Sequence, residues 1–493
     1  MEKVFVNSTR PCNVARITEN FTQLRTLLNL AAAQATHTGR ATPASLVLPF
    51  PASDALRVFR VLHYLYPGEC TYWEQPARQM ALAGAGIALS IQTTGSRRFA
   101  DAALAWQQLR DEAIVQYASG SSENQAGPAL FGGFSFDPLR ARTPLWQGFS
   151  DGVLILPRLL FRQQKHQATL TLSCLVEATD NLDHLIDTLQ QEITQFSELM
   201  ATLPDAPKDA SAEAHMYSMR DVWPAASWKA LVHKTVGLIQ QGSYAKVVLA
   251  REVEVMASSQ QQPFQLATVL ERLRQNYPAA YVFALQRGER TFVGATPERL
   301  VHAQDGQLHT MALAGSAPRG ATEEEDRSLG SALLASSKNR EEHEIVTTML
   351  RASLANLCSR TWIADTPELL RLKNIQHLQT AIVGELQPGR SILEALQMLH
   401  PTPAVGGTPT DSALAFIRAN ENLDRGWYAG PIGWIDLHGD GEFAVALRSA
   451  LLERRRATLF AGCGIVKNSD PEAEYAESCL KLQVILRSLS GEE

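Results

Sequence analysis

The sequence predicts a mixed fold of helices and antiparallel strands, of the α+β or complex α/β class. Helical patterns, in which apolar residues recur every three or four positions, and extended patterns both occur along most of the 493 residues. They follow one another without the regular strand–helix–strand alternation of a Rossmann fold or a barrel. The composition, 45% hydrophobic and 19% charged, is that of a globular protein and excludes the disordered and fibrous classes.

Local patterns place the individual elements along the chain. Apolar residues with helical spacing predict helices at residues 19–35, 180–203, 227–245 and 336–354. Extended or alternating runs predict strands at residues 44–50, 152–161 and 246–257. Residues 433–466 predict three antiparallel strands, with turns at His438–Gly441 and around Arg454–Arg456.

Two features bear on domain organisation. Residues 204–221 (PDAPKDASAEAHMYSMRD) are rich in Ala, Asp, Pro and Ser and carry no period, which predicts a linker. The similarity of GGFSFD (132–137) to GPIGWID (430–436) suggests that the chain consists of two related halves.

Charge and cysteine usage narrow the functional class. The net charge is −6 and no Lys/Arg cluster is interleaved with aromatic residues, which argues against nucleic-acid binding. The six cysteines are widely spaced and form no zinc-binding pattern, so we interpret them as reduced thiols. No apolar run approaches the roughly 20 residues of a membrane span, and the first residues lack a signal-peptide core. We therefore expect a soluble cytoplasmic protein.

The stretch SDPEAEYAESCLKLQ (469–483) is typical of a helix start. Asp470 is a suitable N-cap, and Pro471 at the first helical position costs little because its missing N–H would be unpaired there. Glu474, Glu477 and Lys481 then project from one face, beside an apolar stripe. This charged face is either a solvated salt-bridge surface or part of a site for a hard cation such as Mg²⁺.

Four further ionisable residues are candidates for chemistry, and each has an ordinary structural alternative. Lys246 enters an apolar strand, and Glu298 follows a strand and precedes a possible helix start. The third candidate is one of the acids Glu341, Glu342 and Glu344, which lie in charged first helical turns. Arg448 lies inside the alternating run EFAVALRSAL, where an unpaired guanidinium is costly unless it faces solvent. Together these residues predict a site for a small anionic molecule.

The order of nine motifs resembles that of a known family. These are KVVLAREVEV, FVGATPERL, ALAGSAPRG, SSKNREEHEIV, QHLQTAIVGEL, LHPTPAVGGTP, WYAGPIGWID, FAVALRSALL and AGCGIVKNSDPEAEYAESCLKL. Over residues 225–490 they resemble the chorismate-utilising enzymes, which include isochorismate, salicylate, anthranilate and aminodeoxychorismate synthases. The loop HPTPAVGGTP is most similar to that of isochorismate synthases, whereas the ammonia-using synthases have a Thr-containing variant ending in GAPK.

The resemblance implies an anthranilate-synthase-component-I-like fold: two antiparallel β-sheets sandwiched between helices in one large unit. Residues 1–203 would complete the sandwich, 204–221 would be a surface linker, and 222–493 would be the chorismate-binding catalytic region. The implied activity is that of a Mg²⁺-dependent isomerase, an isochorismate synthase of the menaquinone or siderophore type, acting without an obligatory protein partner. Salicylate synthase, and an ammonia-using anthranilate or aminodeoxychorismate synthase, remain the alternatives.

The resemblance also implies roles for individual residues. Lys246 matches the general base that activates water, and Glu298 matches the general acid that protonates the leaving hydroxyl. The residues that match Mg²⁺ ligands are Glu342 and Glu477, with Glu474 in or just outside the coordination shell. Those that match substrate-binding positions are Gly315, His377, Tyr428, Arg448, Gly462, Gly464 and Lys481.

Overall fold

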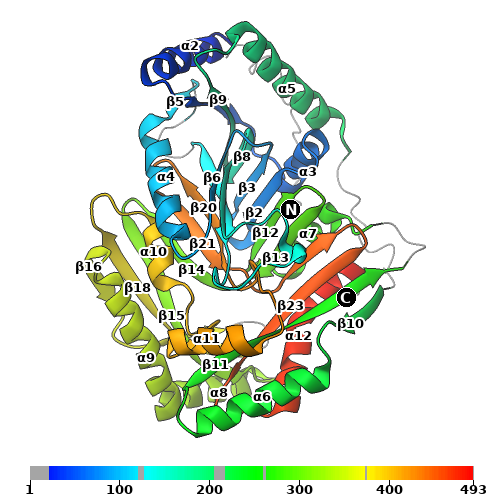
Figure 1. The fold of residues 1–493 in the computed structure, drawn as a ribbon, viewed down its shortest axis with the longest axis vertical. Coiled ribbons are helices and arrows are strands. Elements are labelled where there is room, and N and C mark those ends of the chain that lie inside the picture. Colours follow the sequence, from blue (N-terminus) through cyan, green and yellow to red (C-terminus); the bar gives the residue numbers. More distant parts are fainter. Residues whose placement is uncertain are drawn as a thin grey trace, which may run out of the picture.

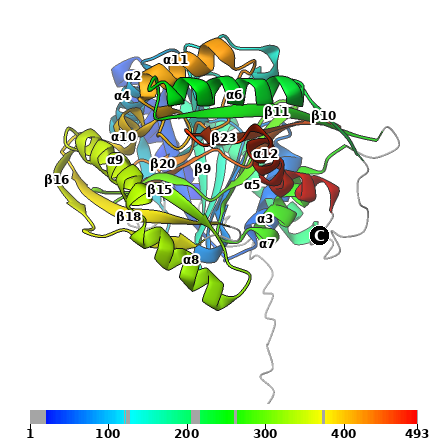
Figure 2. The same cartoon turned by 90° about the horizontal axis from the view of Figure 1, so that it is seen from below.

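Two large β-sheets form the centre of the molecule and helices cover their outer faces (Figures 1 and 2). The computed structural model describes residues 21–119, 121, 127–204, 217–258, 263–371 and 375–491. Among the helices of these ranges, none combines the length and the apolar character that a membrane span requires. The expected sandwich of two sheets between helices is confirmed.

The first sheet has 13 strands within the described residues, and all neighbours are antiparallel except β1 and β5. Its order is β10 (Tyr217–Asp221), β11 (Lys246–Ala257), β23 (Arg456–Ile465), β22 (Ser449–Glu453), β13 (Arg290–Thr296), β12 (Tyr281–Arg287), β2 (Cys70–Gln75), β3 (Met80–Ala85), β8 (Leu159–Gln164), β9 (Gln167–Val176), β1 (Thr42–Phe50) and β5 (Ile114–Tyr117), with β19 (Gly407–Thr408) also paired to β11.

The second sheet has 10 strands in the described part of the chain. Its order is β16 (Cys358–Ile363), β18 (Ile375–Leu386), β15 (Gln307–Pro318), β14 (Arg299–Gln304), β21 (Gly441–Val445), β20 (Pro431–Asp436), β6 (Ala129–Phe134), β7 (Gly152–Leu156) and β4 (Leu89–Thr93), with β17 (Glu368–Arg371) paired to β18.

The helices divide according to the sheet that they cover. On the first sheet lie α2 (Phe21–Thr38), α3 (Ala55–Leu65), α5 (Leu182–Thr202), α6 (Ala225–Gln240), α7 (Leu266–Asn276), α11 (Thr410–Asn420) and α12 (Pro471–Ser490). On the second lie α4 (Arg98–Glu112), α8 (Glu323–Ala335), α9 (Ser337–Leu354) and α10 (Ile392–Leu399).

Strand β12 shows how the sequence builds these layers. Tyr281, Phe283 and Leu285 point into the core that includes both sheets, whereas Val282 and Ala284 point into the core under the outer helices. Because successive side chains of a strand alternate between its faces, a strand that is buried on both faces is apolar throughout. This is why β12 lacks the apolar–polar alternation of a surface strand.

The chain crosses from one sheet to the other at places that the sequence patterns do not reveal. The run 152–161, predicted as one strand, is divided into β7 of the second sheet and β8 of the first. The run 433–466, predicted as three strands, contains β20, β21, β22 and β23. In both runs the residues on either side of the crossing are buried, so the apolar pattern continues through it.

The predicted linker is shorter on its C-terminal side than expected. Residues 205–216 lie outside the described residues, and the last five positions, Tyr217–Asp221, form the edge strand β10. The backbone pairing with β11, rather than side-chain burial, keeps this polar segment in the sheet, since its central residues are exposed.

The order of elements supports the prediction of two related halves. The series α2-β1-α3-β2-β3-β4-α4, then β6-β7-β8-β9-α5, matches the series α6-β11-α7-β12-β13-β14-α10, then β20-β21-β22-β23-α12. The match leaves out α-helices and strands without a counterpart: β5, β10, β15, α8, α9, β16, β17, β18, β19 and α11. The two strands that carry the similar motifs, β6 and β20, are antiparallel neighbours in the second sheet. Helices α5 and α12 are therefore counterparts.

Candidate active site

The site is built around two adjacent crossings between the sheets, from β13 to β14 and from β21 to β22. The Thr296 hydroxyl donates to the Val445 carbonyl (2.6 Å), and the Val445 N–H donates to the Glu298 carbonyl (2.9 Å). The Ala295 N–H donates to the Arg448 carbonyl (3.1 Å). These bonds hold the two crossings side by side, with Glu298 on one and Arg448 on the other.

Two local expectations for these residues are wrong. Glu298 does not start a helix, and Arg448 does not lie within a strand, because the chain changes sheets at both positions. Arg448 has a φ of 48°, a left-handed conformation that costs a side-chain-bearing residue about 1–2 kcal/mol. The surrounding hydrogen bonds maintain this conformation at the crossing.

Lys246 begins β11 and lies across the neighbouring strand β23. A Cβ atom added at Gly464 would lie 2.6 Å from Lys246 Cε and 3.2 Å from Nζ, so the lysine occupies space that any side chain at Gly464 would take. Burial lowers the pKa of Lys246, and Lys481 adds to this effect, while Glu342 and Glu298 oppose it. Lys246 is thereby shifted toward its neutral form.

Glu298 lies close enough to Lys246 for their charges to interact, and its pKa is shifted in the opposite direction. Burial raises the pKa of its carboxyl group, although the positive charges of Lys246 and Arg448 partly offset the shift. A lysine and a carboxylic acid that are both pushed toward their uncharged forms are suited to act as base and acid, respectively.

Arg448 provides a positive charge that the protein leaves available. Its guanidinium is largely surrounded by protein, which lowers its pKa, and it has no ion-pair partner among the described residues. Tyr428 lies nearby and stacks on Phe460, with ring centroids 5.2 Å apart. Burial raises the pKa of the Tyr428 phenol, which therefore remains a hydrogen-bond donor. The pair is suited to binding a carboxylate that enters the site.

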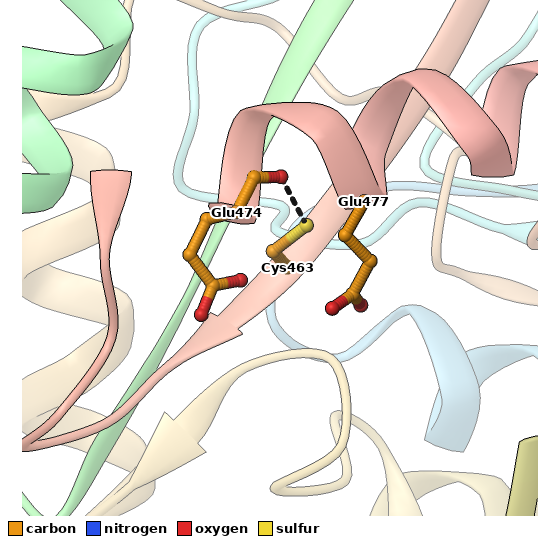
Figure 3. A group of neighbouring side chains, drawn as sticks. All are labelled: Cys463, Glu474 and Glu477. Carbon is orange, nitrogen blue, oxygen red and sulfur yellow. Dashed lines mark hydrogen bonds between the residues drawn. The ribbon is translucent and has the colours of Figure 1, made fainter. Parts of the chain in front are cut away.

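Helix α12 presents two carboxylates on one side, as the sequence predicts. Asp470 caps the helix by accepting a hydrogen bond from the Ala473 N–H (2.9 Å). Glu474 and Glu477 follow at a spacing of three, and ligand atoms of these two residues and of Cys463 all lie within 4.8 Å of one another. Figure 3 shows both carboxylates projecting to the same side of the helix, with Cys463 between them.

The chemistry of this cluster suits a hard cation. The Cys463 thiol donates to the Glu474 backbone carbonyl (3.2 Å), and burial raises its pKa to about 12, so it remains protonated and is a poor metal ligand. Burial also raises the pKa of Glu474, and the adjacent Glu477 carboxylate adds repulsion that a cation would relieve. Two carboxylates with room for water are typical of Mg²⁺ sites.

The structure does not place all three predicted metal ligands in one cluster. Glu342, on α9, lies outside the Cys463–Glu474–Glu477 group and is the strongest acidic neighbour of Lys246. Lys481 pairs with Glu477 (2.6 Å) and donates to the Gly462 carbonyl (2.9 Å).

The remaining predicted residues line the same region. Gly315 interrupts the register of β15 and has a φ of 76°, which favours glycine. The His377 ring is hydrogen-bonded to the Gly315 backbone, and burial lowers its pKa, with Lys246 contributing. Gly462 and Gly464 lie on the partly accessible face of β23, and a Cβ at Gly462 would lie 3.1 Å from the Tyr428 hydroxyl.

The sequence analysis missed two buried residues that hold the backbone next to the site. The buried pair Glu421–Arg425 connects β11 to the loop before β19: Glu421 accepts from the Ala250 N–H (2.6 Å), and Arg425 donates to the carbonyls of Val405 (3.1 Å) and Val248 (2.8 Å). The only signal was the i, i+4 spacing of opposite charges. That loop and Glu298 also border a cavity of about 30 Å³, large enough for one water molecule.

A site that combines a lysine of lowered pKa, a carboxyl group of raised pKa, a guanidinium largely surrounded by protein and a carboxylate pair is typical of an enzyme acting on a small anionic substrate. A family model described as chorismate binding enzyme matches residues 29–490. The chain belongs to this family of chorismate-binding enzymes.

Individual relatives agree with this assignment. The chain is 36% identical to isochorismate synthase MenF of Bacillus subtilis, covering 89% of this chain and 92% of that protein. It is 40% identical to the salicylate biosynthesis isochorismate synthase of Pseudomonas aeruginosa, covering 86% and 85%. The solved structure of MenF, the menaquinone-specific isochorismate synthase from Escherichia coli, superposes with a TM-score of 0.72 at 29% identity, covering 94% of this chain and 99% of that one.

Proposed function

We propose that this protein is an isochorismate synthase, an isomerase that converts chorismate to isochorismate with Mg²⁺. The observation that carries the proposal is the proximity of Lys246 and Glu298, whose charges interact and whose pKa values are shifted in opposite directions. The names of the relatives support the choice of reaction, since both the Bacillus subtilis and the Pseudomonas aeruginosa proteins are isochorismate synthases.

The two residues divide the proton transfers of the reaction. Neutral Lys246 removes a proton from water as the water oxygen bonds to ring carbon two of chorismate. The ring double bonds shift, the bond between carbon four and its hydroxyl oxygen breaks, and Glu298 gives that oxygen a proton, releasing water. The atoms balance, because one water molecule enters and one leaves.

After one turnover Lys246 and Glu298 are both charged, and both must return to their uncharged forms before the next turnover. Lys246 has become an ammonium and Glu298 a carboxylate, and the burial of both disfavours these forms. Transfer of a proton from Lys246 to Glu298, directly or through a water molecule, restores both. The same desolvation that prepares the residues for catalysis therefore also returns them to their starting state.

Other side chains position the substrate. Arg448 and Tyr428 bind the enolpyruvyl carboxylate, for which Arg448 is suited because its planar guanidinium forms forked hydrogen bonds to a carboxylate. The charges of Glu298 and Glu477 also act on Arg448. Lys481 adds positive charge beside the Glu474–Glu477 pair. Gly462 and Gly464 leave space on β23 for the substrate, while Gly315 and His377 border its ring. When the substrate carboxylate is held at one end of the site, ring carbons two and four of the substrate lie between the base Lys246 and the acid Glu298.

Glu474 and Glu477 would hold the Mg²⁺ ion, and Glu342 on α9 remains a further candidate ligand. When bound, the ion neutralises the ring carboxylate of the substrate and stabilises negative charge that develops on it. We also propose a cytoplasmic location, which the free thiols of the described cysteines support. Menaquinone or siderophore synthesis is the proposed use of the product.

The direct test is to incubate the pure protein with chorismate, in Mg²⁺ and then in excess EDTA, and to resolve the products by chromatography. We expect isochorismate with Mg²⁺ and none with EDTA. Salicylate together with pyruvate would identify a salicylate synthase instead. Aminated products that appear only when ammonium is added would identify an anthranilate or aminodeoxychorismate synthase, and unchanged chorismate under all conditions would refute the proposal.

A further inference from the structure

The half of α12 that carries the two carboxylates has an aromatic anchor, Tyr475, which packs against the buried Trp228 of α6 with ring centroids 6.1 Å apart. In the second half, Leu482, Ile485, Leu486 and Leu489 are buried in the core, whereas between Pro471 and Lys481 the only buried residue is Ser478. Leu480, the one leucine of this first half, is 71% exposed. Core packing therefore fixes the second half of the helix through four buried side chains, but reaches the turns that present Glu474 and Glu477 through the Tyr475 ring.

Arg251, on β11, makes the contacts that hold this first half. Its Nε donates to the Ser478 hydroxyl (2.6 Å), and a terminal nitrogen contacts Cys479 Sγ (3.0 Å). Its guanidinium lies over the Tyr475 ring, 4.4 Å from the centroid. Its other terminal nitrogen pairs with Asp221 of β10, which also accepts a hydrogen bond from the Tyr475 hydroxyl (2.6 Å). One buried side chain thus joins β10, β11 and α12.

The position of Arg251 is unusual for a residue that serves stability alone. On the same face of β11, Val247 and Leu249 belong to one apolar core and Val253 and Val255 to another, so Arg251 interrupts a continuous apolar row. Its side chain is only 4% exposed. Because desolvation offsets much of the attraction in a buried ion pair, an apolar residue here would serve stability as well.

Helix geometry connects this contact to the carboxylates. Tyr475 and Ser478 directly follow Glu474 and Glu477, so each contact lies about 100° around the helix axis from a carboxylate. A rotation of the first half of α12 would move both carboxylates together. Arg251 opposes that rotation through its contacts with Tyr475, Ser478 and Cys479. We propose that Arg251, with Asp221 and Tyr475, is a positioning residue that fixes the rotation of α12 and thereby the metal-binding geometry of Glu474 and Glu477. This inference rests on the proposed function and extends it.

The test is to remove the buried charges without leaving one unpaired, in the double variant Arg251→Met/Asp221→Asn. The control is Arg158→Met/Glu192→Gln, which removes a partly buried ion pair, with an Nε–Oε2 distance of 2.7 Å, between the crossing from β7 to β8 and α5, the counterpart of α12 in the other half. Mn²⁺ alone, without chorismate, is titrated into each protein, and its affinity is measured by electron paramagnetic resonance. Thermal unfolding in EDTA measures stability separately.

We expect the Arg251/Asp221 variant to bind Mn²⁺ 10- to 100-fold more weakly than the wild type, the effect of losing residues that orient metal ligands. The control should bind within twofold of the wild type, and Arg251→Lys should recover only part of the loss because lysine cannot form the forked contacts. If the double variant does not fold, Tyr475→Phe, which removes one hydrogen bond to Asp221, should still weaken Mn²⁺ binding several-fold.

Three outcomes would overturn the inference. Mn²⁺ affinity that is unchanged while the unfolding temperature falls would make Arg251 purely structural, and equal losses in variant and control would show a nonspecific effect. Absence of Mn²⁺ binding by the wild type would refute the metal site and, with it, the positioning role of Arg251. Because the titration needs no turnover, Mn²⁺ binding that depends on Arg251 in a protein inactive on chorismate would sustain the positioning role and refute only the proposed reaction.

Discussion

Gly464→Ala tests whether the glycine on β23 exists to make room for Lys246. The new Cβ would lie 2.6 Å from Lys246 Cε, whereas non-bonded carbon atoms approach to about 3.5 Å at the closest favourable distance. The lysine stem must therefore move by about 0.9 Å, because the Cβ is fixed by the backbone of a sheet strand that pairs with β11.

The expected cost follows from that displacement. A misplacement of about 1 Å between reacting groups lowers the rate by roughly 10²-fold. We expect kcat with chorismate to fall by about this factor and KM to change by less than about threefold, since Arg448 and Tyr428 hold the substrate carboxylate elsewhere in the site.

The matched control is Gly237→Ala on α6, where an added Cβ has no atom within 4 Å and the backbone has ordinary helical angles. This change should stabilise the helix by about 0.5–1 kcal/mol and leave turnover unaltered. Both variants are assayed by initial-rate chromatography of isochorismate, with thermal unfolding as a check on folding. Full activity in Gly464→Ala would refute the assignment of Lys246 as the base.

Two further predictions concern the perturbed pair. Because the pKa of Lys246 is lowered in the folded protein, the unfolded chain binds more protons between that value and the ordinary 10.5, so wild-type stability rises with pH over this range. Lys246→Met should be inactive but more stable than the wild type at pH 7, and the difference in stability should shrink as the pH rises toward 10.5. An equal difference at pH 7 and pH 9.5 in thermal unfolding would count against a desolvated lysine. For wild type, kcat/KM should be bell-shaped in pH, rising as Lys246 loses its proton and falling as Glu298 loses its own. Glu298→Gln should lower kcat by about 10²–10⁴-fold and abolish the falling limb of a pH–rate profile, and a retained limb would assign it to another group.

Local sequence patterns predicted the part of the site that lies on a helix. The cap at Asp470 and the shared face of Glu474 and Glu477 follow from spacing alone, because helix periodicity is set within a few residues. The resemblance to the family added Lys246 and Glu298 to the predicted site, two residues that are about 50 positions apart in the sequence.

The other residues of the site could not be predicted from local patterns, because their positions depend on how the two sheets meet. Arg448 was predicted inside a strand because apolar residues lie on both sides of the crossing from β21 to β22, so no apolar signal marks the change of sheet. The role of Arg251 was missed because its partners, Asp221 and Tyr475, are brought to it by sheet pairing and helix packing. Residues joined by such long-range contacts have no common local pattern from which they could be predicted.

The central claim is that the new hydroxyl group comes from water activated by Lys246. It is tested most directly by running the reaction in H₂¹⁸O to low conversion and measuring the mass of the isochorismate. The account predicts one ¹⁸O atom in each product molecule, at ring carbon two, and none in the unreacted chorismate. Isochorismate that contains only ¹⁶O would show that the hydroxyl group migrates within the substrate, and would contradict the roles assigned to both Lys246 and Glu298.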